Sequence, residues 1–150
     1  MDIYQVVAIA ARMQLDKWEL HDFEFRFDNA KKRAGSCQVG RGEKFITLSR
    51  HFVRMNEDNM EQIKDTILHE IAHAKAGPGN GHNELWKMWC RLVGANPTRC
   101  YDSKEVAMPK GKVVAYCPCH AEHRRHRMPR SYHVYHCNTC NALLTWKREA

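Results

Sequence analysis

The sequence lacks any long hydrophobic run. Its longest apolar stretch, Val6 to Ala11, falls far short of the roughly 18 residues that a membrane-spanning helix needs. That stretch also lacks the basic flank of a secretory signal peptide. Internal repeats and low-complexity tracts are missing as well. We therefore expect a cytoplasmic globular chain without a membrane partner, built as one domain or as a compact domain with a small appendage.

Acidic residues are scarce in the C-terminal part of the chain. Residues 108–150 hold 8 Lys or Arg against 2 Asp or Glu, whereas residues 1–107 hold 16 against 15. Most of the formal charge of +7 therefore lies in the C-terminal segment. A basic appendage on a near-neutral body indicates contact with a polyanion, with nucleic acid as the leading candidate. The alternative is a solvated tail that only improves solubility.

The seven cysteines suit metal ligands or buried thiols better than disulfides in a reducing compartment. Cys117 and Cys119 form one pair, and Cys137 and Cys140 form a second pair after a basic loop. This arrangement predicts a zinc ribbon around one structural zinc. Because the first pair has C-x-C spacing, His120 is an alternative to Cys119 as the fourth ligand. So short a segment cannot build an adequate core, so we expect the metal to supply much of its folding free energy.

Basic and aromatic residues accompany the cysteine pairs. Arginine can pair with phosphates, and tyrosine can stack on exposed bases. The segment therefore predicts a surface for single-stranded or double-stranded DNA, or for RNA, without a sequence-specific reader. Its six candidate residues are Arg124, Arg125, Arg127, Arg130, Tyr132 and Tyr135.

The most informative pattern is H-E-x-x-H at residues 69–73. Positions i and i+4 lie on one face of a helix, so His69 and His73 can bind a single Zn²⁺. Glu70 can then serve as the general base for a water on that metal, and His82 is the candidate third ligand. These residues predict a catalytic zinc and the layout of a metalloprotease.

The surroundings of the motif favour a helix over residues 57–76, with Asn56 or Asp58 as its N-cap. Apolar residues recur at helical spacing on the side opposite the histidines. Residues 77–81 read Gly-Pro-Gly-Asn-Gly, which ends the helix and allows His82 to return to the metal. Glu84 is the rival third ligand. The non-functional alternative is a surface helix whose histidines are only solvated.

Other elements follow from the same periodicities. We expect a helix over residues 3–15 and strands within 18–28, 37–39 and 44–49. A helix over residues 83–93 is expected to bury a face with Leu85, Trp89, and Leu92 or Val93. Residues 97–111 are predicted to be a linker. The predicted domains are therefore a catalytic domain at 1–108 and a basic zinc ribbon at 109–150.

Four blocks of sequence resemble the SprT-like metalloproteases, the family that includes Spartan. They cover most of the chain and comprise Phe25 to Ser49, residues 68–74, residues 81–97 and the C-terminal ribbon. The resemblance implies a small zincin-like α+β domain, with an N-terminal helix, a short antiparallel sheet and the H-E-x-x-H helix, followed by a zinc ribbon. It also implies three histidine ligands, a glutamate base, and proteolysis of DNA-associated proteins such as DNA–protein crosslinks.

Two departures from the family pattern remove no catalytic group. Asn83 follows His82 where the family often has Gly-His-Gly, and the first cysteine pair is C-x-C. One alternative function is a non-catalytic zinc-ribbon protein that binds nucleic acid, and another is a zinc hydrolase acting on a non-peptide bond. The intact Glu70 argues against the first, because metal binding alone does not require that carboxylate.

Overall fold

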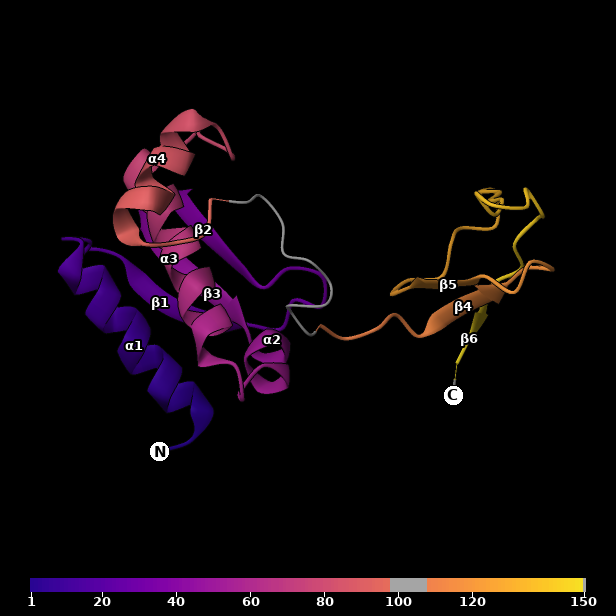
Figure 1. Ribbon diagram of the computed structural model, residues 1–150, viewed down its shortest axis with the longest axis horizontal. Helices are drawn as coiled ribbons and strands as arrows, with labels where there is room; N and C mark the ends of the chain where they lie inside the picture. The colour runs from indigo at the N-terminus through magenta and orange to yellow at the C-terminus, as the bar shows by residue number, and fades with distance from the viewer. Residues whose placement is uncertain (98–107, 150) are drawn as a thin grey trace. The chain divides into compact units, whose positions relative to one another are not determined.

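The computed structural model describes residues 1–97 and 108–149 (Figure 1). The chain forms two compact units, Met1–Met108 and Pro109–Ala150. Most of the linker predicted over residues 97–111 lies outside the described residues. None of the described helices combines the length and apolar character needed to cross a bilayer.

The first unit combines four helices with a three-stranded sheet. β3 is the central strand of this sheet and pairs in parallel with β1 and antiparallel with β2. The α+β class is confirmed, but the sheet is mixed rather than antiparallel throughout, because β3 lies between β1 and β2 and runs parallel to β1. In chain order the elements are α1 (Ile3–Lys17), β1 (Glu24–Asp28), β2 (Gly35–Gly40), β3 (Glu43–Ser49), α2 (Arg50–Met55), α3 (Met60–Ala76) and α4 (Glu84–Val93).

The helix carrying the H-E-x-x-H motif starts later than predicted. The N-cap of α3 is Asn59, whose side chain accepts a hydrogen bond from the backbone N–H of Gln62. Asn56 instead follows the end of α2, where its side-chain amide donates to the carbonyl of Phe52 at 2.8 Å. The unpredicted short helix α2 therefore uses the residue that the sequence offered as a cap for α3.

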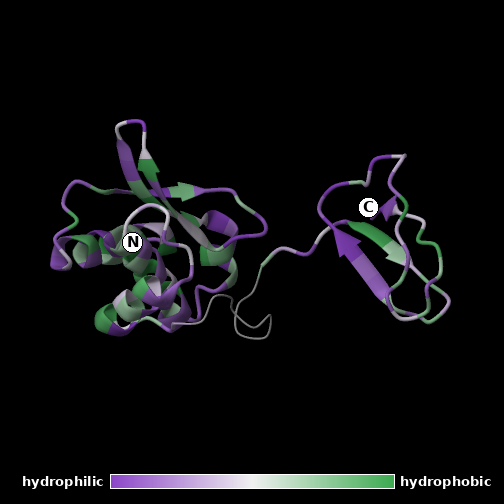
Figure 2. Cartoon of the chain, turned by 90° about the horizontal axis from the view of Figure 1, so that it is seen from above, coloured by the Kyte–Doolittle hydropathy of each residue, from purple (hydrophilic) through white to green (hydrophobic). Residues whose placement is uncertain are grey.

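A single core joins α1, β3, α3 and α4. The helix α1 begins with a capping box between Asp2 and Gln5 and buries Val7, Ala11 and Leu15. Figure 2 shows hydrophobic residues on the helices and strands of this unit, with hydrophilic residues at the turns. This core holds α3 against the sheet and so fixes the backbone that carries the motif.

The buried face of α4 differs from the sequence prediction. Trp86, Cys90 and Val93 are buried, whereas Leu85 and Leu92 are 41% and 57% exposed. The predicted core face is therefore wrong for Leu85 and Leu92, whereas Val93, the alternative to Leu92, is buried and Trp89 is partly buried. The indole of Trp86 packs against the rings of His69 and His82. The Trp86 face of α4 therefore points into the core, and the Leu85 side points to solvent.

The second unit is a small antiparallel sheet with the strand order β5-β4-β6. Its strands are β4 (Val113–Tyr116), β5 (Glu122–Arg125) and β6 (Lys147–Arg148). Figure 2 shows a hydrophobic β4 beside a hydrophilic β5. The buried cluster of this unit contains Ala115, Cys117, Cys137 and Leu144, and Val113 and Val114 of β4 are buried as well. The cysteine cluster is compatible with the predicted zinc ribbon.

Candidate metal centre and active site

The histidines of the motif come from α3 and from the loop after it. His69 and His73 lie one turn apart on α3, which ends at Gly77, where φ is +89°. A second left-handed glycine, Gly79, helps the loop to turn back. The side-chain amide of Asn80 donates to the carbonyl of Ala76 at 2.8 Å and ties this loop to the helix end. The turn therefore brings the third histidine back to the helix.

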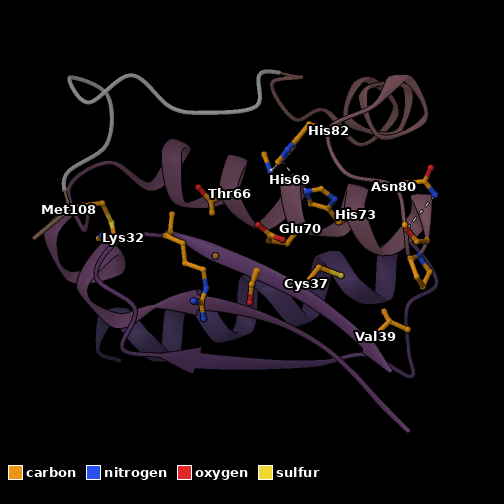
Figure 3. A pocket seen from close by; sticks show the side chains of 17 residues that line it. Lys32, Cys37, Val39, Thr66, His69, Glu70, His73, Asn80, His82 and Met108 are labelled. Atoms are coloured by element: carbon orange, nitrogen blue, oxygen red, sulfur yellow. Dashed lines mark hydrogen bonds between the residues drawn. The ribbon is translucent and has the colours of Figure 1, made fainter. Parts of the chain in front are cut away.

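The three imidazoles converge on one point (Figure 3). The Nε2 atom of His82 lies 3.3 Å from Nε2 of His69 and 3.3 Å from Nε2 of His73. Tetrahedral coordination with metal–nitrogen bonds of about 2.0–2.1 Å would separate the nitrogens by about 3.3–3.4 Å. The observed spacing therefore fits three ligands of one tetrahedral ion, with a fourth position left for another group.

The local electrostatics favour neutral imidazoles, which are the form that binds metal. Burial, reinforced by the neighbouring histidines, lowers the pKa of His69 to about 3. Burial also lowers the pKa of His73, with a further contribution from His82. The backbone of Asn80 hydrogen-bonds the His73 ring and opposes this shift. A backbone contact of this kind also orients a ligating ring.

Glu70 lies beside this centre and is only 6% exposed. Burial raises the pKa of the Glu70 carboxyl to about 8, and the positive charge of Arg33 partly offsets the rise. The guanidinium of Arg33 is itself paired with Asp28 at 2.8 Å. A metal ion bound by the histidines would add a second positive influence and favour the ionised carboxylate. Glu70 is therefore placed to accept and release a proton in a site largely shielded from solvent.

A groove of about 740 Å³ runs between α3 and the segment that leads into and forms β2. Figure 3 shows Glu70 and the histidines along it, with Lys32 and Met108 toward one end and Val39 and Asn80 toward the other. In the described sheet β2 pairs only with β3, so its other edge is open. An extended peptide can pair with such an edge.

Glu84, the rival third ligand, lies elsewhere. It is the first residue of α4, its side chain is 84% exposed, and it approaches the amine of Lys87 at 3.5 Å. The described cluster around the motif comprises His69, His73 and His82.

Sequence reasoning missed three residues at this site. The indole of Trp86 contacts the rings of all three histidines. Gly35 lies against Glu70, and Arg33 lines the groove. Trp86 shares a helical face with Cys90 and Val93 at spacings of four and three, a signal present in the sequence beside the competing Leu85 face. The roles of Gly35 and Arg33 depend on strand packing, which the local sequence does not reveal.

The second cluster contains four cysteines in the C-terminal unit. The ligand atoms of Cys117, Cys119, Cys137 and Cys140 all lie within 4.8 Å of one another. The Sγ atom of Cys117 is 2.9 Å from that of Cys119 and 3.4 Å from that of Cys137. Zinc–sulfur bonds of about 2.3 Å would place the sulfurs about 3.8 Å apart, so a modest expansion would accommodate the ion. Among the described residues, this cluster includes Cys119 and leaves out His120.

The thiols are held in unequal environments. Backbone N–H groups, first that of Cys140 and then that of Thr139, lower the pKa of Cys137 to about 5. The neighbouring thiol of Cys117 raises the pKa of Cys119 to about 12. Crowded thiols cannot all ionise without a cation among them, because adjacent thiolates repel each other. A bound metal removes that conflict, so these residues fit a structural metal site.

The candidate nucleic-acid residues fall into two groups. Arg124 is engaged within the unit, because it pairs with Glu122, with Glu149 at 2.6 Å, and with the carbonyl of Gly111 at 3.0 Å. Arg125 lies 4.8 Å over the ring of Tyr135. These contacts occupy part of both cations.

Tyr135 is partly buried against the core of the unit, whereas the other three candidates face solvent. Arg127 and Arg130 are exposed, and Tyr132 is 66% exposed. The guanidinium of Arg130 donates to the hydroxyl of Tyr132 at 2.7 Å. These residues keep cationic and aromatic surface accessible to a ligand.

A helix with two histidines one turn apart, a returning third histidine and an adjoining buried glutamate define a metalloprotease-like domain. The model of the SprT-like family matches residues 3–106. The chain therefore belongs to the SprT-like family, and the resemblance identified in its sequence is confirmed. No curated protein sequence matches the chain.

Proposed function

We propose that this protein is a zinc-dependent endopeptidase that cleaves DNA-associated proteins, including DNA–protein crosslinks. The observation that carries the proposal is the convergence of three histidine Nε2 atoms beside the buried Glu70. His69, His73 and His82 would hold the catalytic zinc, and the four cysteines would hold a structural zinc. When bound, the catalytic zinc would acidify a water and polarise the scissile carbonyl.

In this proposal Glu70 carries the proton. Its carboxylate accepts a proton from the attacking water and later delivers it to the leaving amine. Burial supports this role, because it raises the pKa of Glu70 and so makes the carboxylate a stronger base than an exposed glutamate. The walls of the groove limit access of bulk water to the carboxylate.

The groove supports a polypeptide substrate. Residues of β2 line it, and the open edge of this strand can offer backbone hydrogen bonds to an extended segment of any sequence. Backbone pairing needs an extended segment, so we expect cleavage in loops, tails or unfolded regions of the target. The same feature favours peptide hydrolysis over hydrolysis of a small non-peptide substrate.

The C-terminal unit supports recruitment to DNA. Its surplus of basic residues and its exposed Arg127, Arg130 and Tyr132 suit phosphate contact and base stacking. We propose that this surface holds single-stranded or double-stranded DNA and brings bound proteins to the protease.

The test combines zinc content with proteolysis. The full-length chain is assayed for zinc and for cleavage of a DNA-binding protein, with and without single-stranded DNA. The matched control is Glu70→Gln, which keeps the size of the side chain and removes the base. We expect two zinc ions per chain, DNA-stimulated cleavage by the wild type, and none by the variant.

Other results would discriminate the alternatives. Cleavage by Glu70→Gln at the wild-type rate would refute the base assignment. Two zinc ions and DNA binding without cleavage in any condition would favour the non-catalytic zinc-ribbon protein. Hydrolysis of a small ester, with no cutting of proteins, would favour a hydrolase of non-peptide bonds.

A further inference from the structure

Trp86 forms a common wall for the three histidines of the metal centre. Its ring centroid lies 4.6 Å from that of His69 and 4.6 Å from that of His82, with both pairs in edge-to-face geometry. The His73 ring stacks on the indole at 5.3 Å, with an angle of 26° between the planes. The Trp86 side chain is fully buried. One side chain therefore contacts every imidazole of the cluster.

Two hydrogen bonds hold Trp86, one through its backbone and one through its indole. The Trp86 backbone N–H donates to the side chain of Asn83, the N-cap of α4, at 3.1 Å. Its Nε1 donates to the carbonyl of His69 at 3.4 Å. Asn83 directly follows His82 in the chain. Trp86 is therefore linked to His69 on α3 through its indole and to the loop of His82 through Asn83. The buried indole is thus tied to the backbone of α3.

Contact with the buried indole restricts the rotation of each imidazole. Metal ligands must keep their donor atoms within about 0.5 Å of the productive geometry, and packing by surrounding residues supplies that precision. Rings that are ordered before the metal arrives lose less conformational entropy when they bind it. The geometry points to Trp86 as a positioning residue that orders the three imidazoles for metal binding. This inference rests on the proposed metal site and deepens it.

Trp89 provides a matched control. It lies on the same helix three residues later, is only partly buried, and packs beneath the amine of Lys75 at 5.6 Å. Replacing either tryptophan changes the same type of side chain in α4. Only Trp86 has ring contacts with all three imidazoles in the described structure.

The experiment titrates the metal-depleted full-length chain with cobalt(II). Cobalt bound by thiolates absorbs strongly in the near ultraviolet and also in the visible, whereas cobalt bound by imidazoles absorbs mainly in the visible and more weakly. The near-ultraviolet band therefore follows the cysteine site, and the histidine site is followed by the visible change that remains after the thiolate spectrum is subtracted. The variants are Trp86→Leu, Trp86→Phe and Trp89→Phe, each checked for helix content by circular dichroism.

We expect Trp86→Leu to weaken cobalt binding at the histidine site by about 10–100-fold, the range for removing residues that support metal ligands. Trp86→Phe should weaken it by about tenfold, at the low end of that range, and should shift the visible bands because the imidazoles are no longer held at the same angles. Trp89→Phe should keep both the affinity and the spectrum. The thiolate site should be unchanged in all three variants.

A folded Trp86→Leu protein with wild-type affinity would overturn the inference. If that variant does not fold, Trp86→Phe decides the question, and a wild-type affinity with an unchanged spectrum would overturn it. An equal loss in Trp89→Phe would also overturn it, since the effect would then belong to α4 as a whole. Failure of the protease proposal is distinct: the wild type would bind cobalt at the histidines but cleave no protein.

Discussion

Gly35→Ala tests whether close packing of β2 positions Glu70, the proposed catalytic base. A Cβ atom at Gly35 would lie 2.8 Å from the carbonyl oxygen of Thr47, 3.0 Å from Cδ2 of Leu48 and 3.3 Å from Cγ of Glu70. Ordinary contact begins at 3.4 Å, so the Thr47 contact alone requires a shift of 0.6 Å. Leu48 is fully buried and Thr47 belongs to the central strand, so neither can yield without moving the sheet.

The size of the effect follows from this crowding. Overpacking a filled core typically costs about 1–3 kcal/mol. For a unit of this size, 1 kcal/mol corresponds to a change in Tm of about 4–8 °C. Because a misplacement of about 1 Å at a catalytic group can cost about 100-fold in rate, a shift of half that size should reduce cleavage by about tenfold. Zinc affinity should stay near that of the wild type, because none of the three atoms nearest to the added Cβ belongs to a histidine.

The assay measures Tm, zinc affinity and cleavage for the same preparations. Gly81→Ala is the control, because its added methyl group would have no atom within 4 Å and its backbone is not in the left-handed region. It should keep a Tm close to that of the wild type. The reasoning is refuted if Gly35→Ala matches the wild type in both Tm and cleavage rate.

Three further predictions concern the ribbon and the acid–base behaviour of the site. Stripping the thiolate metal with a strong chelator should expose Pro109–Ala150 to trypsin while the helical circular dichroism signal persists, because the core of that unit is small. Arg124→Ala should lower the thermal stability of the ribbon with little loss of DNA affinity, because Arg124 pairs with Glu149. Arg127→Ala should weaken DNA binding and reduce its salt dependence, because Arg127 is exposed. Fluorescence anisotropy with labelled DNA at several salt concentrations distinguishes the two variants. In the metal-free protein, burial raises the pKa of Glu70 from 4.5 to about 8, so the folded state favours the protonated carboxyl. The stability that this protonated carboxyl contributes is present below about pH 4.5 and is lost as the pH rises toward 8, because the unfolded chain ionises first. Glu70→Gln should therefore have a higher Tm than the wild type at pH 8 in chelator, and a difference that persists unchanged at pH 5 would contradict that origin.

The sequence was informative wherever function depends on local spacing. Two histidines four residues apart define one face of a helix, and the glycine-rich turn after them accounts for the return of His82. The cysteine pairs were recognisable for the same reason, since ligand spacing is a short-range property. These features are set by a few neighbouring residues and do not require knowledge of the tertiary structure.

Features that depend on distant packing were not predictable in this way. Arg124 meets Glu149, a residue 25 positions away, so its engagement in an ion pair is invisible to local patterns. The helix α2 has only six residues, too few to show a hydrophobic period. On α4 two faces competed, and the need to pack Trp86 under the imidazoles decided between them. Tertiary contacts therefore resolved what local sequence left ambiguous.

Asn83 holds the loop that carries His82, the proposed third ligand, against the start of α4. The Asn83 side chain accepts from the Trp86 backbone and donates to the side-chain oxygen of Asn80 at 2.8 Å, so it links the loop to the start of α4. A glycine has no side chain to make either contact. Because the helix begins at Glu84, that carboxylate points to solvent in the first turn, while His82 remains in the loop facing α3. His82 rather than Glu84 therefore lies where a third ligand would be needed, and Asn83 caps the helix whose start separates the two residues.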